Sequence, residues 1–195
     1  MTFSAICGLI AGVIFSISAG WYVTDVAKQK VVPSIATFLM FTIINISQLA
    51  SLIAKQIWSV LPFTLVGLAS SLAICVLALR RKKFYLELPD KIGFVGAFIG
   101  FMVWAATKNA AINLYIISIV NLITFAPLII KSFKRPDLET LLPWRLNLVA
   151  SFFLLLTVNS ASVVVWVVPV RQFVCSLLLN IGLLRGAIKS KTVLK

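Results

Sequence analysis

Residues 161–184 have the sequence ASVVVWVVPVRQFVCSLLLNIGLL, an apolar run that contains a single charged residue, Arg171. A helix needs roughly 20 apolar residues to span the hydrocarbon core of a bilayer. If Arg171 lay outside the membrane, only residues 173–184 would remain before Arg185, which is about 18 Å of helix and too short. The segment therefore predicts a transmembrane helix with Arg171 inside the membrane.

The rest of the chain has the same character. Of its 195 residues, 61% are hydrophobic and 12% are charged, and the mean hydropathy is +1.08, which is far from the composition of soluble domains. The first apolar stretch follows no positively charged region, so we expect a retained helix and not a cleaved signal peptide. We predict an all-α membrane protein with seven transmembrane helices, at Phe3–Val23, Val32–Ala54, Ile57–Leu79, Ile92–Thr107, Asn109–Ile130, Pro143–Val158 and Ala161–Leu184.

The charged residues are distributed unevenly over the two faces of this arrangement. Fifteen of the 18 Lys and Arg residues and all five carboxylates fall on one face, whereas the other face has only Lys55 and Lys108. Because cytoplasmic loops are rich in Lys and Arg, we expect the N-terminus outside and the C-terminus in the cytoplasm, in a bacterial inner membrane or a plasma membrane. Anionic lipid headgroups account for the net charge of +13, so no nucleic-acid partner is expected. Tryptophans near the span ends, as in interfacial aromatic belts, are Trp21, Trp58, Trp144 and Trp166.

A residue pattern occurs twice at a constant separation. Lys28, Pro33, Thr37 and Phe41 recur 103 residues later as Lys131, Pro136, Thr140 and Trp144. The third and seventh spans also correspond, in Pro62 with Pro169 and in Arg80 with Arg185. Parallel repeats of three helices need a helix between them that inverts the chain. We therefore predict a first three-helix bundle at 1–80, a linker loop and helix at 81–108, and a second bundle with a cytoplasmic tail at 109–195.

The second repeat contains the segments FAPLIIK (125–131), KRPDLET (134–140) and LPW (142–144). They resemble the PQ-loop and SWEET transporter superfamily, in which a proline near the cytoplasmic end of a helix is followed by a basic loop and by a proline that opens the next helix. Pro127 and Pro143 match the prolines, and Lys131 and Glu139 match the loop. The resemblance implies two three-helix bundles around a central site. The sequence departs from the motif at Gly20, Trp21 and Thr24, where the first repeat lacks the proline, and at Leu128, which replaces glutamine.

Polar residues of five spans are predicted at one depth in the membrane. Such groups cost free energy in hydrocarbon unless they are paired or face a cavity, and transporter sites lie near the midplane between repeats. For Ser70, Ser71 and Ser151 we favour hydrogen bonds between helices. The predicted substrate-binding residues are Asn45, Gln48, Asn121, Arg171 and Gln172.

Two explanations of Arg171 remain open, because no carboxylate is predicted at its depth. It either pairs with carbonyls freed by Pro169 or with Gln48 or Asn45, or it faces a water-filled cavity and meets an anionic ligand. Prolines within helices remove a backbone hydrogen bond and allow a kink. The predicted hinges are Pro62, Pro127, Pro143 and Pro169.

The sequence therefore predicts a transporter that works by alternating access on a small polar metabolite, neutral or anionic, such as a sugar, a nucleoside or a vitamin precursor. The lack of Asp, Glu and His within the spans favours facilitated diffusion over a proton relay. No nucleophile beside a base, metal cluster or phosphate loop is recognisable, so we expect no enzyme and no cofactor. The alternative is a non-transporting seven-helix receptor, regulator or scaffold, and a homo-oligomer is left open. Free thiols are expected at Cys7, Cys75 and Cys175.

Overall fold

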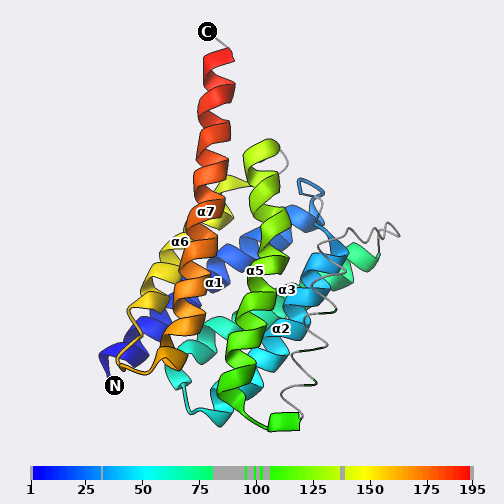
Figure 1. Ribbon diagram of the computed structural model, residues 1–195. Coiled ribbons are helices and arrows are strands. Elements are labelled where there is room, and N and C mark those ends of the chain that lie inside the picture. The colour runs from blue at the N-terminus through cyan, green and yellow to red at the C-terminus, as the bar shows by residue number, and fades with distance from the viewer. Residues whose placement is uncertain are drawn as a thin grey trace.

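The computed structural model describes residues 2–31, 33–80, 95, 99, 102, 106–136 and 139–193, with side chains up to Arg185. This part of the chain is helical and contains no strand (Figure 1), which confirms the all-α prediction. The predicted fourth span, Ile92–Thr107, lies largely outside the described residues. The α-helices are α1 (Phe3–Ala27), α2 (Ile35–Ala54), α3 (Leu61–Leu79), α5 (Ala110–Lys134), α6 (Leu141–Leu155) and α7 (Val163–Val193), and a 3-10 turn, η1 (Trp58–Val60), precedes α3.

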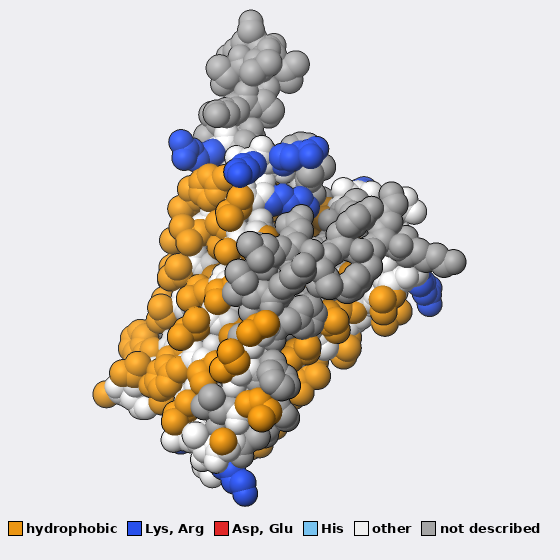
Figure 2. All heavy atoms as spheres, turned by 45° about the vertical axis from the view of Figure 1, so that its right-hand side comes forward, with side chains coloured by type: hydrophobic (Ala, Val, Ile, Leu, Met, Phe, Trp, Pro, Cys, Tyr) orange, Lys and Arg blue, Asp and Glu red, His pale blue; other side chains and the backbone are white. Residues whose placement is uncertain are grey.

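Five of these helical segments are long and apolar enough to cross a membrane: α1, α2, η1 with α3, α5, and residues Val163–Arg185 of α7. Their outward faces carry hydrophobic side chains, which cover much of the surface in Figure 2. The described part therefore has the character of a multi-pass membrane protein. Helix α6 is shorter than its predicted span, Pro143–Val158, because the chain leaves the helix in a turn that joins Thr157 N–H to the Leu154 carbonyl.

Three helices extend past their predicted spans. Helix α1 continues to Ala27, α5 to Lys134 and α7 to Val193. Hydropathy marks the hydrocarbon core, whereas a helix can continue through the polar headgroup layer. In the last turn of α5, Lys131 and Lys134 also favour the negative end of the helix dipole. The spans were therefore too short at the ends that carry basic residues.

The described helices form a closed ring. Their closest contacts run from α1 to α6, α7, α5, α2, α3 and back to α1. In this ring α1 lies opposite α5, α2 opposite α6, and α3 opposite α7. If each helix is exchanged with the opposite one, every pair of neighbouring helices becomes another neighbouring pair, for example α1 with α6 becomes α5 with α2. The arrangement is therefore consistent with two similar three-helix halves about a twofold axis through the centre of the ring.

The separation between the two halves differs from the one that the loop pattern predicted. Helices α1 and α5 both contain 25 residues and begin 107 residues apart, at Phe3 and Ala110. Helices α2 and α6 begin 106 residues apart, at Ile35 and Leu141. Helices α3 and α7 begin 102 residues apart, at Leu61 and Val163. The predicted separation of 103 residues is thus wrong by about one turn for the first two pairs of helix starts and close for the third. Consistent with this shift, Thr37 lies inside α2 whereas Thr140 is the N-cap of α6.

The two ends of the ring differ in charge. Figure 2 shows Lys and Arg side chains gathered at the end from which α7 projects. We call this the basic end. It holds the last turns of α1, α3 and α5 and the first turns of α2 and α6. The other end, which we call the N-terminal end, holds the start of α1, where Ser4 Oγ donates to the Thr157 carbonyl after α6.

Candidate functional site

A cavity of about 90 Å³ lies at the centre of the ring and is lined by all six described helices. The five residues predicted to bind substrate all lie on its wall. Gln48, Asn121, Arg171 and Gln172 are buried, and Asn45 is half-buried. Gly67 of α3 leaves space for the Asn45 amide, because a Cβ at Gly67 would lie 3.3 Å from both amide heavy atoms. The structure thus brings together, in one cavity, groups that are up to 127 positions apart in the sequence.

Arg171 is the only charged residue on the described wall of the cavity, and 7% of its surface is exposed. Its Nη2 donates to Gln48 Oε1 at 3.1 Å, and its Nη1 donates to Ser118 Oγ at a longer 3.5 Å. Both acceptors are neutral, and in the described part of the chain neither ion pair includes Arg171. The positive charge therefore lacks a protein counter-ion among these residues, as the sequence predicted.

Gln48 connects Arg171 to the first half of the ring. Its Nε2 donates to Thr64 Oγ1 of α3 at 2.9 Å, and Thr64 Oγ1 donates to the Val60 carbonyl at 3.2 Å. This chain of hydrogen bonds runs from α7 through α2 to α3 and orients the Gln48 amide so that its oxygen faces Arg171. The pairing of Arg171 with Gln48, one of the alternatives left open by the sequence, is thus observed. It supplies one hydrogen bond of ordinary length and no negative charge.

Several buried polar atoms of residues on the cavity wall have no hydrogen-bond partner among the described residues. They are Arg171 Nε and the Oδ1 atoms of Asn121 and Asn147. Leaving a buried polar group unpaired costs about 1–3 kcal/mol, so such atoms are rare in folded proteins. All three belong to residues that line the cavity.

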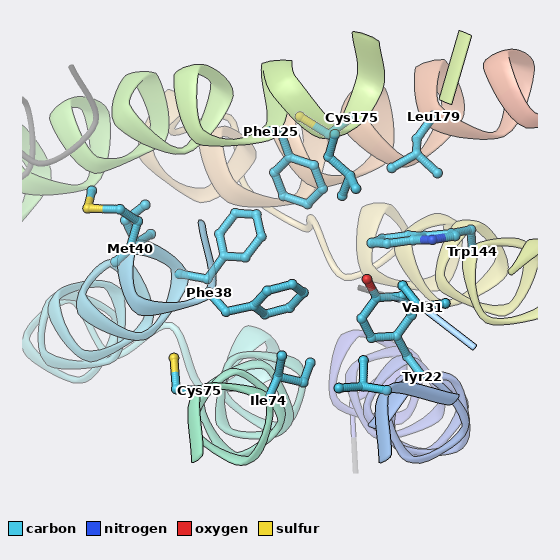
Figure 3. Close-up of a cluster of buried hydrophobic side chains, with 14 of the residues drawn as sticks. Tyr22, Val31, Phe38, Met40, Ile74, Cys75, Phe125, Trp144, Cys175 and Leu179 are labelled. Atoms are coloured by element: carbon cyan, nitrogen blue, oxygen red, sulfur yellow. The ribbon is translucent and has the colours of Figure 1, made fainter. Parts of the chain in front are cut away.

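An aromatic cluster closes the cavity toward the basic end. It consists of Tyr22, Phe38, Phe41, Phe125 and Trp144, which come from α1, α2, α5 and α6 and line the cavity. Figure 3 shows the labelled rings of Tyr22, Phe38, Phe125 and Trp144 directed toward the same central space. Ring centroids lie 5.4 Å apart for Tyr22 and Trp144 and 4.8 Å apart for Phe41 and Phe125. Both pairs join the first half of the ring to the second.

A buried carboxylate supports this cluster. Glu139, in the loop before α6, accepts hydrogen bonds at 3.4 Å from the Tyr22 hydroxyl and the Trp144 Nε1, and at 2.8 Å from Lys131 Nζ. Its side chain is 1% exposed. The sequence placed Glu139 correctly at the charged face but assigned it only to a loop motif. Asp25 is also buried and pairs with Lys30 at 3.8 Å, whereas Glu87, Asp90 and Asp137 lie outside the described residues.

Apolar side chains close the cavity toward the N-terminal end. Phe15 and Phe63 line the cavity there and stack with their centroids 4.1 Å apart. Beyond them a buried cluster includes Leu52, Leu114 and Leu154 from α2, α5 and α6. These three residues again come from both halves of the ring, so packed side chains of both halves lie on the N-terminal side of the cavity as well as on its basic side.

The predicted hinge prolines fall into two groups. Pro127 and Pro169 lie inside α5 and α7, where proline removes a backbone hydrogen bond. Pro62 and Pro143 lie in the first turns of α3 and α6, where the backbone N–H has no partner within the helix to lose. The expectation that each of the four removes a helical hydrogen bond is therefore wrong for Pro62 and Pro143. Pro143 instead accepts, through its carbonyl, a 2.7 Å hydrogen bond from Ser18 Oγ.

The serines at this depth divide differently from the prediction. Ser71 lines the cavity and pairs with Thr42 of α2 at 3.0 Å, as an interhelical bond would. Ser70 and Ser151 donate to carbonyls within their own helices. Of these three serines, only Ser71 bonds to another helix, and its partner there is the buried Thr42.

Sequence reasoning missed Asn147 and the aromatic cluster. The predicted sixth span, 143–158, has Ser151 at its centre. The helix observed, α6, runs from Leu141 to Leu155, so Asn147 lies near its middle. Trp144 was assigned to an interfacial belt but is 8% exposed, in contrast to 48% for Trp21. Its position three residues before Asn147, on the same face of a helix, is a signal that could have placed it on the cavity wall.

The described residues offer no site for a metal ion, since no group of three His, Cys, Asp or Glu side chains occurs among them. The three cysteines are free and buried, as predicted. Comparison with known proteins gives no match: no protein-family model matches the chain, and neither a curated protein nor a solved structure matches it. The assignment of function therefore rests on the cavity.

Proposed function

We propose that this chain is a membrane transporter, a facilitator that carries a small polar solute by alternating access. The observation that carries the proposal is the central cavity, which is lined by residues of α1, α2, α3, α5, α6 and α7 and has packed clusters with side chains from both halves of the ring on either side of it. In alternating access, a central site of this kind opens to one side of the membrane at a time. Opening each end in turn would then move a solute across.

The contacts between the halves support a rocking motion. Helix α1 packs against α6 and α2 packs against α5, whereas the other close contacts of the ring lie within a half. Near the basic end the halves meet at Tyr22 and Glu139. Near the N-terminal end they meet at Asn113, whose Nδ2 donates to Ser47 Oγ and Ser51 Oγ at 2.9 and 2.6 Å. Each end thus has its own contact to break, which is what alternating access requires.

The seven-helix arrangement with a linker helix is part of this proposal. Helix α3 ends at Leu79 at the basic end, and α5 begins at Ala110 near the N-terminal end. The intervening chain, residues 80–109, must therefore cross from one end to the other, and it contains the apolar stretch 92–107. Such a crossing supports two parallel bundles with an inverting helix between them, as the resemblance to PQ-loop and SWEET transporters implies.

The positive-inside rule supports an orientation with the basic end in the cytoplasm, in a bacterial inner membrane or a plasma membrane. Facilitated diffusion is supported by the charges of the wall. The described lining of the cavity has no carboxylate, and Glu139 beyond the aromatic cluster is held by Lys131. No group at the depth of Arg171 is thus free to carry a proton with the solute.

Reconstitution into proteoliposomes tests the proposal. The purified protein is first screened by thermal shift against sugars, nucleosides and small organic acids, because a ligand at 100 times its Kd stabilises by about 2.7 kcal/mol. Each compound that raises the melting temperature is then tested for counterflow, with Arg171→Leu protein as the matched control. We expect at least one compound to exchange across vesicles that contain the parent protein. A compound that binds and never crosses would contradict transport and favour the receptor alternative.

A further inference from the structure

We propose that the cavity binds a small organic monoanion, specifically a short aliphatic hydroxy or keto carboxylate, whose carboxylate is held by Arg171. The proposal deepens the proposed function by naming the class of solute, and it rests on that function only for the claim that the solute crosses the membrane. It stands on the charge of the wall, on its unpaired polar atoms and on its size.

The charge of the wall selects an anion with one negative charge. Arg171 is the charged residue of the described lining, and its two partners, Gln48 and Ser118, are neutral. The buried carboxylates of the described part, Asp25 and Glu139, are already paired with lysines near the basic end. In surroundings of low dielectric a buried charge needs a counter-charge. One carboxylate neutralises Arg171, whereas a dianion would leave an excess charge in the cavity.

The unpaired atoms select a solute with a second polar group. Arg171 Nε and one side-chain amide atom of each of Asn121 and Asn147 are buried and have no partner among the described residues, and all three residues line the cavity. The oxygen and nitrogen of such an amide are assigned from their surroundings. A hydroxyl group can donate and accept, so it pairs with either orientation. A keto group pairs with an amide that offers its N–H.

The size of the cavity selects a short solute. The cavity of about 90 Å³ is smaller than the cavity of about 150 Å³ that holds benzene in an engineered protein. A three-carbon acid suits such a space better than a nucleoside or a disaccharide. The apolar rings of Phe15, Phe63 and Phe41 on the wall suit the methyl or methylene part of such an acid.

Matched pairs of probes test this inference in binding experiments on the purified protein. Glycolate, L-lactate, D-lactate and pyruvate are titrated by calorimetry in chloride-free buffer. Lactamide has the shape of lactate without its charge, and propionate has the charge without the hydroxyl. We expect at least one of the four acids to bind, lactamide to bind about 100-fold more weakly than lactate, and propionate about 5-fold more weakly.

Variants of Arg171 provide the control on the protein side. Arg171→Leu should abolish binding of the acids, and Arg171→Lys should retain the preference for lactate over lactamide because it keeps the charge. Equal affinity for lactate and lactamide, or no saturable binding of any of the four acids, would overturn the inference. Chloride that competes with lactate at equal concentration would also overturn it, since the site would then accept any small monoanion.

The outcomes separate this inference from the proposed function. Acids that bind with the expected preference and fail to exchange across proteoliposomes would refute transport and leave the anion site standing. Exchange of a neutral sugar or nucleoside that is unchanged in Arg171→Leu protein would refute the anion site and leave transport standing.

Discussion

Glu139 and Arg171 are both buried charged residues, but they differ in how far neighbouring groups neutralise their charge. Glu139 has a lysine at 2.8 Å and accepts hydrogen bonds from two aromatic side chains, so its negative charge is neutralised within the protein. Arg171 has one hydrogen bond of ordinary length to an amide, a longer one to a hydroxyl, and an Nε without a partner. The first arrangement stabilises a fold. The second leaves a charge that a ligand can complete.

The position of the two charges agrees with this difference. Glu139 lies behind the aromatic cluster, away from the cavity, whereas Arg171 lies on the cavity wall. A buried charge that serves structure is expected to be neutralised locally, because breaking a buried pair typically costs about 3–5 kcal/mol. A binding group must instead remain available. The contrast predicts that the two residues respond differently to mutation.

Removal of the Glu139 carboxylate should have the largest effect on stability. In Glu139→Ala protein, the Tyr22 hydroxyl and the Trp144 N–H lose their acceptor and Lys131 loses its counter-ion, so we expect a loss of about 3–5 kcal/mol in the free energy of unfolding. Titration with SDS in mixed micelles measures this loss. Glu139→Gln, which keeps an acceptor oxygen, should lose clearly less. If Glu139→Ala protein were as stable as the parent, the Glu139 carboxylate would not stabilise the fold, and the contrast with Arg171 would fail.

Replacement of Arg171 should affect transport instead. We expect counterflow of the bound acid in Arg171→Leu protein to fall by about 100-fold, which corresponds to about 2.7 kcal/mol of lost interaction with the carboxylate. Arg171→Lys should retain an intermediate rate. The measurement compares initial rates in proteoliposomes that contain equal amounts of folded protein, and a parent-like rate in Arg171→Leu protein would place the site elsewhere.

The membrane potential tests whether Glu139 stays paired during transport. If Lys131 holds Glu139 throughout, a monoanion crosses without a proton and its distribution follows the potential. An inside-negative potential of about 100 mV, set with potassium and valinomycin, should then lower the inside-to-outside ratio of the acid about 50-fold. Accumulation that follows a pH gradient and ignores the potential would instead show that a proton moves with the anion.

A small effect is expected from the hydroxyl of Tyr22. Its hydrogen bond to Glu139 Oε2 is long, at 3.4 Å, and Lys131 and Trp144 still contact the carboxylate without it. Tyr22→Phe keeps the ring in the aromatic cluster, so we expect a loss of about 0.5–1 kcal/mol in the free energy of unfolding. A loss as large as that of Glu139→Ala would show that the hydroxyl, and not the lysine, is the main partner of the carboxylate.

The sequence predicted the cavity residues well because the prediction required only helix geometry. A count along a span places a residue at a depth, and Asn45, Gln48, Asn121, Arg171 and Gln172 were found in this way. The same count missed Asn147, since its helix begins and ends earlier than the apolar segment indicated. If the predicted ends of a helix are wrong by a few residues, the count places a different residue at the midplane.

The contacts of Glu139 could not be predicted from the sequence. The carboxylate meets Tyr22, 117 positions away, through a loop whose path is not encoded in any periodic pattern. The loop pattern predicted two halves separated by 103 residues, whereas the paired helix starts are 107, 106 and 102 residues apart. Short loops can gain or lose a few residues without moving the helices that they connect.

The central claim is that the charge of Arg171 is left for a ligand. Thermal unfolding of the parent and of Arg171→Leu protein, each with and without the acid that binds most tightly in the calorimetric panel, tests it most directly. We expect the variant without ligand to melt at or above the temperature of the parent, since an incompletely paired buried charge has been removed, and the acid to raise the melting temperature of the parent alone. A variant that is destabilised and is still stabilised by the acid would contradict the account, because Arg171 would then be a structural clamp.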